Sequence, residues 1–316
     1  MRVLVGTLYT GENEFEQSKR SLQRQTHGNW EQVVFKHLSN KEAHDRLYRT
    51  FMDHADDFDL FVKLDADMVF RSEKSLQTLV GLFESQPELD HALLAVRDWA
   101  SDTLIMGLHA YSHRAVWTPS GEKLFVDHSP SVPGKRLSTE GPPAPLVDHS
   151  PDPSPFQAFR FGVHRALKVI QRDRSRLDLF RSRMQWTLLN DVRRRFAETE
   201  HRRLGLIVAG AEEVFAGRAT RNEYDDAGDQ LHERFCKRYA DLSVNELKTV
   251  LSSWGDSPSQ RWSTYVGTVG AGRIAKAACV AFPKRMAATV YRRLSSEFIT
   301  SLDDPPDTPE PTPELS

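Results

Sequence analysis

Two carboxylates separated by one residue, Asp65 and Asp67, follow directly after an apolar run at residues 60–64. Such a run indicates a buried strand, and in an open α/β sheet ligands bind at the carboxyl ends of the strands. Side chains alternate along an extended chain, so Asp65 and Asp67 point the same way and repel each other unless a cation lies between them. Mg²⁺ or Mn²⁺ with oxygen ligands meets this need, and a diphosphate would complete the coordination shell. The sequence therefore predicts a metal site at Asp65 and Asp67.

Positively charged side chains follow later in the chain, at Arg160, Arg165 and Lys168. The three lie on or near one face of a predicted helix that starts at about residue 156. Arginine and lysine stabilise a diphosphate through charge-assisted hydrogen bonds, so Arg160 is predicted to contact the diphosphate. The alternative interpretation of these residues is an ordinary solvated helix face.

Strands and helices alternate in the part of the chain that leads to this site. Strands are predicted where short apolar runs occur, at residues 3–8, 33–35, 60–64, 92–96, 103–111 and 123–126. Helices are predicted at residues 14–25 and 41–55, with Asn40 as the cap of the second, and after Ser72. The early alternation is typical of a parallel, doubly wound α/β sheet.

The rest of the chain divides by composition. Residues 129–155 are rich in Pro, Gly and Ser and predict a long loop near a site, whereas residues 156–201 predict basic helical structure. Residues 269–294 alternate small apolar residues with cations, as a helix on an anionic membrane surface does, but Pro283 would interrupt such a helix, and a packed helix pair is favoured. We expect a domain over residues 1–215, a helical extension over 216–300, and a disordered, acidic, Pro-rich tail over 301–316.

Composition limits the classes of function. The chain has 316 residues, 39% hydrophobic and 27% charged, as a soluble globular protein does. A net charge of −2 gives no electrostatic footprint for nucleic acid. Two cysteines, Cys236 and Cys279, are too few for a disulfide framework and favour a reducing compartment. Because neither a signal peptide nor a membrane-spanning run is recognised, we expect a cytoplasmic protein, with residues 269–294 as the candidate for peripheral membrane contact.

The first part of the chain resembles the GT-A glycosyltransferases, especially the family 2 group. The resemblance rests on the first strand and loop Val5–Glu12, on the segments Ser21–Thr26 and Asn29–Glu31, and on the Asp-Ala-Asp motif, and it covers about residues 1–165. It implies a GT-A fold, a doubly wound and mostly parallel sheet with a helical extension. It also implies a metal-dependent, inverting transfer of a sugar from a UDP- or GDP-sugar to an acceptor hydroxyl. A surface polysaccharide or a glycolipid fits as the acceptor.

The resemblance also implies roles for single residues. The nucleotide-sugar contacts it implies, together with Arg160, are Thr7, Tyr9, Glu12, Ser39, Lys63 and Asp65, with His37 also near the base. Such enzymes commonly bring a later residue, often a histidine, to the metal. His149 suits that role because imidazole accepts borderline divalent ions, and His128 and His164 are the alternatives.

An inverting reaction needs a carboxylate base that takes the proton of the acceptor hydroxyl. Asp148 follows the Asp-Ala-Asp motif at the separation that the family uses, and Asp127 and Glu140 are its rivals. The chain departs from the family pattern in two places. It lacks the acidic residue that often follows the second strand, and it lacks the usual Glu-Asp pair.

Two other classes of function compete with this interpretation. In a haloacid-dehalogenase-like phosphatase, Asp65 would be the nucleophile and Asp67 the acid and base. That motif normally follows the first strand of its domain, whereas here it follows the third. The fold also needs a later acidic pair at a strand end, and the candidate pair Asp225 and Asp226 lies in a polar segment. The second alternative is a non-catalytic relative that binds a sugar or a nucleotide.

Overall fold

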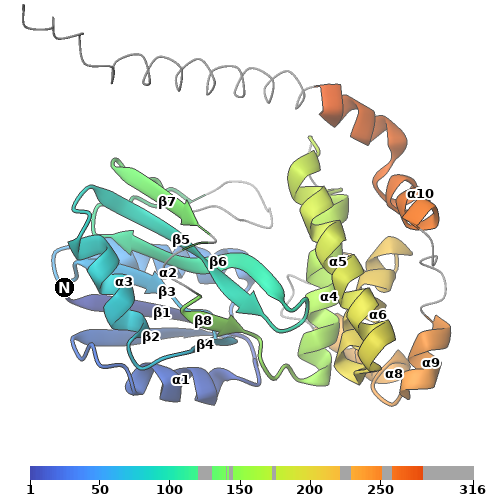
Figure 1. Cartoon of the computed structure of the whole chain (residues 1–316), viewed down its shortest axis with the longest axis horizontal. Helices are drawn as coiled ribbons and strands as arrows, with labels where there is room; N and C mark the ends of the chain where they lie inside the picture. Colours follow the sequence, from blue (N-terminus) through green and yellow to red (C-terminus); the bar gives the residue numbers. More distant parts are fainter. Residues whose placement is uncertain are drawn as a thin grey trace, which may run out of the picture.

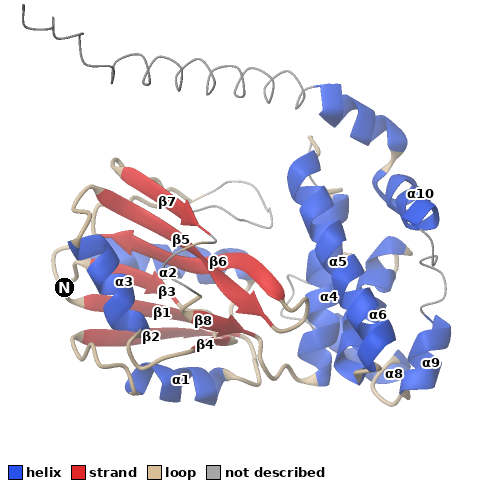
Figure 2. Cartoon of the chain, in the orientation of Figure 1, coloured by secondary structure: helices blue, strands red, loops and turns tan. Residues whose placement is uncertain are grey.

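The computed structural model of the chain describes residues 1–119, 130–139, 141, 145–172, 176–220, 229–250 and 258–279. The described chain has two halves, a sheet flanked by helices and a group of helices beside it (Figure 1; Figure 2). The strands are β1 (Val3–Tyr9), β2 (Trp30–Lys36), β3 (Leu60–Lys63), β4 (Met68–Phe70), β5 (Leu89–Asp98), β6 (Thr103–Ser112), β7 (Lys135–Thr139) and β8 (Val147–His149). The helices are α1 (Phe15–Gln23), α2 (Asn40–Asp53), α3 (Ser75–Glu84), α4 (Pro155–Ile170), α5 (Leu179–Thr199), α6 (Arg202–Phe215), α8 (Asp229–Arg238), α9 (Val244–Val250) and α10 (Pro258–Val269).

The sheet is mixed: among the described strands four pairings are parallel and three are antiparallel, where the sequence predicted a mostly parallel sheet. Its strand order is β2-β1-β3-β6-β5-β8-β4, and β7 also pairs with β5. β1 is parallel to β2 and β3, but β6 is antiparallel to both β3 and β5. β6 reverses direction because a tight turn at residues 99–102, and not a helix, joins it to β5. Asp102 adopts a positive φ of 56° in this turn, and the buried Asp98 accepts a hydrogen bond from the backbone N–H of Ser101.

Both faces of the sheet are covered by helices, and this explains why β1 and β3 are apolar at almost every position. Alternate residues of the two strands point to opposite faces. On one face, α1 and α3 pack in a cluster with Val3, Val5, Leu60 and Val62. On the other face, α2 packs in a cluster with Leu4, Phe61 and Tyr111. α2 is capped by Ser39, whose side chain accepts from the backbone N–H of Glu42, and not by Asn40 as predicted.

The segment at residues 129–155, predicted as a long loop, contributes two strands to the sheet. β7 runs parallel to β5 at one end, and the short β8 lies between β4 and β5 at the other. The predicted strand at residues 123–126 and the predicted tail at 301–316 lie outside the described residues.

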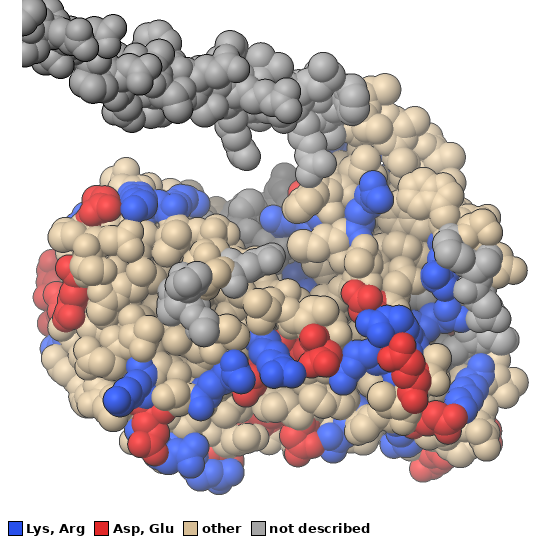
Figure 3. Space-filling model, in the orientation of Figure 1, with Lys and Arg blue, Asp and Glu red and all other residues tan. Residues whose placement is uncertain are grey.

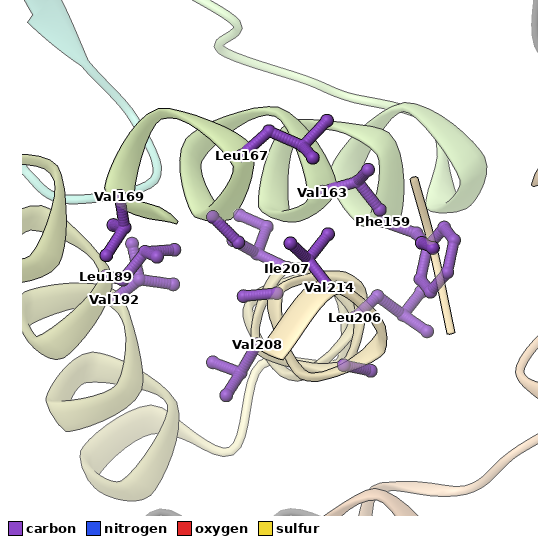
Figure 4. Packing of buried hydrophobic residues seen from close by; sticks show 14 of the residues in the cluster. Phe159, Val163, Leu167, Val169, Leu189, Val192, Leu206, Ile207, Val208 and Val214 are labelled. Carbon is purple, nitrogen blue, oxygen red and sulfur yellow. The ribbon is translucent and has the colours of Figure 1, made fainter. Parts of the chain in front are cut away.

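The helical half is built around a contact between α4 and α6 (Figure 4). A capping box of Ser154 and Gln157 starts α4, and Gln171, in a left-handed conformation, ends it. The basic helical region predicted over residues 156–201 is therefore two helices, α4 and α5. A single hydrophobic cluster joins them to α6 and continues through α8, α9 and α10. The cluster therefore extends across residue 215, the expected boundary between the first domain and the helical extension.

A short helical stretch at residues 271–279 packs onto the same half of the protein. The guanidinium of Arg273 donates to the carbonyl oxygens of Ile170 and Gln171 at the end of α4, at 2.6 Å and 2.7 Å. Ile274 and Ala277 pack against the hydrophobic cluster. This part of the segment predicted at residues 269–294 thus packs against protein, and residues 280–294 lie outside the described chain. Within the described ranges, no helix has the length and apolar character needed to cross a membrane.

Two glycines allow the backbones of α4 and α6 to touch. A Cβ atom at Gly162 would lie 1.8 Å from the carbonyl oxygen of Ile207, and a Cβ atom at Gly210 would lie 2.0 Å from that of Phe159. Neither carbonyl can move aside without distorting its helix. The side chains of Val163, Leu206 and their neighbours fill the space around this contact (Figure 4).

We expect Gly162→Ala to lower the free energy of unfolding by about 3 kcal/mol, because the added methyl group would meet backbone and not a flexible side chain. Urea denaturation measures the change. Gly81→Ala, within α3, is the matched control: nothing lies within 4 Å of its added Cβ, and the better helix propensity of alanine should raise stability by up to about 1 kcal/mol. Equal effects of the two substitutions would contradict the packing account.

Candidate active site

A cavity of about 320 Å³ lies where β1 and β3 end and α4 faces the sheet. Its lining comes from the loop after β1, the start of α2, the residues after β3, the middle of β6, the end of β8 and one face of α4. The described ends of parallel strands therefore meet the helical half at this point, as expected for a ligand site in an α/β sheet.

Asp65 lies in the cavity beside Lys63 at the end of β3. The Lys63 ammonium contacts Oδ2 of Asp65 at 2.5 Å, and the two side chains are 10% and 29% exposed. Burial alone would raise the pKa of Asp65, but the charge and the hydrogen bond of Lys63 hold it below its usual value. Asp65 is therefore a carboxylate at neutral pH. Both residues were predicted from the sequence to belong to the site, and both line the cavity.

Asp67 and His149 line the cavity, and His149 contacts the buried Asp98 in turn, so the three form a line of contacts. Nε2 of His149 lies 3.4 Å from Oδ2 of Asp67, and Nδ1 of His149 lies 2.7 Å from Oδ1 of the fully buried Asp98. Strand register produces this arrangement, because His149 on β8 is the partner of Asp98 on β5 and of Met68, which directly follows Asp67.

The protonation states of Asp67, His149 and Asp98 follow from their burial and from their contacts with one another. Burial raises the pKa of Asp67 to about 6, and the charges of Asp65 and Glu12 contribute to the rise although His149 opposes it. Burial alone would lower the pKa of His149, but Asp67 and the hydrogen bond to Asp98 raise it. Asp98 keeps a lowered pKa despite its burial because it accepts from His149 and Ser101. Asp98 therefore holds the histidine ring in one orientation, with Nε2 toward Asp67.

The polar face of α4 forms the opposite wall of the cavity. The side chains that line it are spaced three or four residues apart, which is the spacing of one helical face, and they are Gln157, Arg160, Phe161, His164, Arg165 and Lys168. The other face of α4 packs on α6. The cations that could have formed a solvated surface thus face the carboxylates across the cavity. On the face shown in Figure 3, by contrast, acidic and basic side chains are interspersed.

The loop after β1 is tied to α4 by hydrogen bonds. The guanidinium of Arg160 donates to Oγ1 of Thr10 at 2.7 Å, and Oγ1 of Thr10 in turn donates to Oε1 of Glu12 at 2.7 Å. Glu12 and Arg160, both predicted at the site, are therefore brought together in the cavity lining, with Thr10 between them.

A second set of bonds centres on Glu14, which is 1% exposed. Its carboxylate accepts from Nε2 of Gln157 at 2.8 Å and from the backbone N–H of Asp152 at 3.0 Å. Burial raises the pKa of Glu14 although these hydrogen bonds oppose the rise. Asn13 also donates to the carbonyl oxygen of Asp152, at 2.7 Å. The loop and the start of α4 therefore form one connected unit.

Five predicted residues lie outside the cavity lining, and one of them is His37, whose ring centroid lies 5.4 Å from that of Tyr9. Thr7 is fully buried and accepts a hydrogen bond from Gln32. The ring of Tyr9 stacks on that of Phe15 with centroids 4.3 Å apart. Ser39 caps α2. Asp148 forms an ion pair with Arg71 at 3.1 Å, because its neighbour His149 takes the face of β8 that points to the cavity.

The alternatives Asp127, His128 and Glu140, and the pair Asp225 and Asp226, lie outside the described residues. His164, the other histidine considered for the metal, does line the cavity.

Four residues of the site were missed in the sequence. Asp98 lies two strands away from Asp67 in the chain, and only pairing between β5 and β8 brings it to His149. Asn40 and His44, on the first turns of α2, and His109 on β6 also line the cavity. A signal existed for Asn40 and His44, since residues four apart on a helix share a face. No local pattern marks Asp98 or His109.

No group of three or more His, Cys, Asp or Glu side chains within the described ranges is arranged to hold a metal ion. Asp67 and His149 approach each other, while Asp65 is paired with Lys63. Among the described residues, a metal held at Asp67 and His149 would therefore need further ligands from a substrate or from water.

No protein-family model and no curated protein matches the chain. Among solved structures, the mannosyltransferase PcManGT from Pyrobaculum calidifontis, in complex with GDP-Man and Mn²⁺, is similar at 12% identity and a TM-score of 0.37, over 87% of this chain and 86% of that chain. TarS from S. aureus is similar at 12% identity and a TM-score of 0.31, over 80% of this chain and 55% of that chain. A197 from STIV is similar at 14% identity and 0.27, over 35% of this chain and 65% of that chain, which is under two thirds of its length. These values establish no family, so a functional proposal has to rest on the site.

We expect Asp67→Asn to stabilise the metal-free protein at neutral pH. A folded pKa of about 6, above the ordinary 3.8, means that the neutral carboxyl favours folding, an effect that is complete below about pH 4 and lost as the pH rises through 6. Above that pH the charged carboxylate costs about 3 kcal/mol relative to the neutral group. Asparagine avoids this cost.

Thermal denaturation in EDTA at pH 7.5 and pH 4 tests this expectation. The variant should melt at a higher temperature than the wild type at pH 7.5, and the difference should shrink at pH 4. Asp148→Asn is the control, since Asp148 is half-exposed in a surface ion pair, and it should show no such gain. A variant that melts below the wild type at both pH values would refute the buried-charge account.

Proposed function

We propose that the chain is a metal-dependent glycosyltransferase, which moves a sugar from a nucleotide-sugar to an acceptor hydroxyl of a glycan or glycolipid. The proposal rests on one observation. Asp65 and Asp67, at the end of a strand, face the cationic side of α4 across a cavity of about 320 Å³. A diphosphate between these walls would have a metal on one side and a guanidinium on the other, which are the two groups that best stabilise phosphate charge.

In this proposal, two of the described residues supply the protein's ligands to a divalent cation. His149 is held through Nδ1 by a buried carboxylate, so its Nε2 is directed at Asp67, and histidine ligands of metals are commonly oriented in this way. In this proposal Asp67 and His149 hold the ion, with Asp65 beside them. A ligand set that includes an imidazole suits Mn²⁺ better than the harder Mg²⁺. When bound, such an ion offsets the charge that develops on the leaving nucleoside diphosphate.

The diphosphate itself would lie against Arg160. Its guanidinium is held by Thr10, and Glu12 holds Thr10 through a backbone and a side-chain bond. A side chain fixed in this way loses little conformational entropy when a ligand binds. Arg160 is therefore oriented before the nucleotide-sugar arrives.

The start of α2 would contact the base of the nucleotide. Asn40 and His44 line the cavity at the side of the loop after β1. Nδ1 of His44 lies 2.8 Å from the carbonyl oxygen of Asn40, so Nδ1 carries a proton and donates to that oxygen. This pair takes the place of Ser39 and His37 in the proposal. Asp148 has no role in it, because its carboxylate lies away from the cavity.

We expect UDP or GDP to bind the wild type in the presence of Mn²⁺ and to bind at least tenfold more weakly in EDTA, because the diphosphate shares the metal with Asp67. Isothermal titration calorimetry measures both affinities. Asp65→Asn/Asp67→Asn should bind the nucleotide with or without Mn²⁺ as weakly as the wild type does in EDTA. Asp148→Asn, a change of the same kind outside the cavity, should bind as the wild type does.

The same titrations distinguish the competing functions. If neither nucleotide binds and the protein releases phosphate from a generic phosphoester, the glycosyltransferase proposal is wrong and the phosphatase alternative replaces it. Binding that is unchanged by EDTA would remove the metal from the proposal. Nucleotide binding without sugar transfer or nucleotide-sugar hydrolysis would leave a non-catalytic binding protein.

A further inference from the structure

Large apolar side chains are exposed on α5 and α10 in the helical half. Phe180 and Met184 of α5 and Trp262 of α10 are 64%, 48% and 50% exposed. Among the described residues, the other large apolar side chains with comparable exposure are Leu104 and Val116, which belong to the half that holds the sheet. Single exposed apolar side chains need no explanation, but several that gather on one surface mark a contact with a partner or a membrane.

Helical spacing and one contact between helices bring these side chains together. Phe180, Arg183 and Met184 are three and four residues apart, so they share one face of α5. The guanidinium of Arg183 lies 6.0 Å from the centre of the Trp262 ring, which connects α10 to that face. α10 lies on the side of the helical half that is turned away from the sheet (Figure 1). We call Phe180, Arg183, Met184 and Trp262 the α5–α10 patch.

The α5–α10 patch stands on a packed core. The ring of Trp262 stacks on that of the fully buried Tyr265, with centroids 5.4 Å apart. The hydroxyl of Tyr265 lies 2.9 Å from that of Ser182, and Ser182 donates to the carbonyl oxygen of Val169 at the end of α4, at 2.7 Å. The exposed side chains are therefore attached to helices that are fixed relative to α4, and they do not need to be ordered by a partner.

The charge on this side of the helical half is positive. Residues 258–279 contain Arg261, Arg273 and Lys276 and no Asp or Glu. Arg273 is used in packing on α4, whereas Lys276 is exposed. Within the described part of the chain, no carboxylate pairs with Arg183 or Lys276. The acidic residue that begins α5, Asp178, is paired with Arg181. Apolar side chains beside cations without carboxylate partners complement a surface that is anionic outside and apolar within.

We propose that the α5–α10 patch binds the surface of an anionic lipid bilayer, where Trp262 and Met184 enter the headgroup region and Arg183 contacts lipid phosphates. Tryptophan prefers this region because its ring is amphipathic, and a cation near an anionic surface favours binding. A second copy of the chain fits less well, because a symmetric contact through this patch would bring like charges together. The inference is independent of the proposed function, because it needs neither the cavity nor its ligands.

Co-sedimentation of the full chain with lipid vesicles tests this contact without nucleotide or metal. Vesicles of phosphatidylcholine alone are compared with vesicles of an equal mixture of phosphatidylcholine and phosphatidylglycerol. The wild type should bind the mixed vesicles at least about tenfold more tightly, because each cation near an anionic surface contributes roughly a fivefold change in affinity. Binding to the mixed vesicles should weaken as salt is added, because salt screens this attraction.

Substitutions in the patch should weaken this binding. Arg183→Glu and Trp262→Ser should each lower the affinity for mixed vesicles by about tenfold. Trp262→Phe should keep most of the affinity but lose the shift of tryptophan emission to shorter wavelength that the wild type shows on vesicles. The matched controls are Arg97→Glu, in an exposed ion pair with Asp102, and Val116→Ser, at a side chain that is 52% exposed. Both controls should bind as the wild type does.

Three results would overturn the inference. The first is a wild type that binds neither kind of vesicle, or both equally. The second is binding to mixed vesicles that survives in both Arg183→Glu and Trp262→Ser, because the contact would then lie elsewhere in the chain. The third is a dimer in light scattering that Trp262→Ser dissociates, which would make the patch a subunit interface. Thermal denaturation shows whether the variants fold, and Arg183→Glu keeps the apolar packing under Trp262 if Trp262→Ser does not.

Discussion

The structure of the cavity depends on charged groups that are held close together and largely away from water. Asp67, His149 and Asp98 are all buried or nearly so, and the arrangement is tolerable because each carboxylate faces the imidazole between them. β8 makes this possible. Although it is only three residues long, it pairs with β4 on one side and β5 on the other, and so brings a histidine between two aspartates from distant parts of the chain.

The helical half sets how far the cationic wall stands from these carboxylates. α4 divides its surface between an apolar face against α6 and a polar face toward the cavity. Gly162 and Gly210 let the two helices meet backbone to backbone, so the position of α4 is fixed by contacts that cannot shift gradually. Arg195 of α5 adds a link to the sheet, since it donates to the carbonyl oxygens of Trp99 and Ala100 in the turn between β5 and β6.

The local parts of this site could be predicted from the sequence, and the parts made by pairing could not. The apolar run before Asp65 indicated the strand, and the alternation of strands and helices indicated that it belongs to an α/β sheet. Asp148 and His149 were both candidates, but the Pro-rich segment gave no sign of β8, and without that strand nothing decided which of the two neighbours faces inward. Asp98 was missed for a related reason: it lies at a hairpin turn, and its partner is 51 residues away.

The hydrogen bonds between residues 13–14 and the start of α4 have a consequence for how the molecule can adapt to a ligand. Glu14 is bonded to Gln157 and Asp152, and Asn13 is bonded to Asp152 as well. The loop after β1 therefore cannot close over a ligand as an independent flap. Any closure would have to carry α4 with it as a rigid body. Since the backbones of α4 and α6 are in close contact at Gly162 and Gly210, that motion would involve the whole helical half. Under the proposed function, the cavity is thus preorganised, and its selectivity would depend on shape and charge that exist before binding.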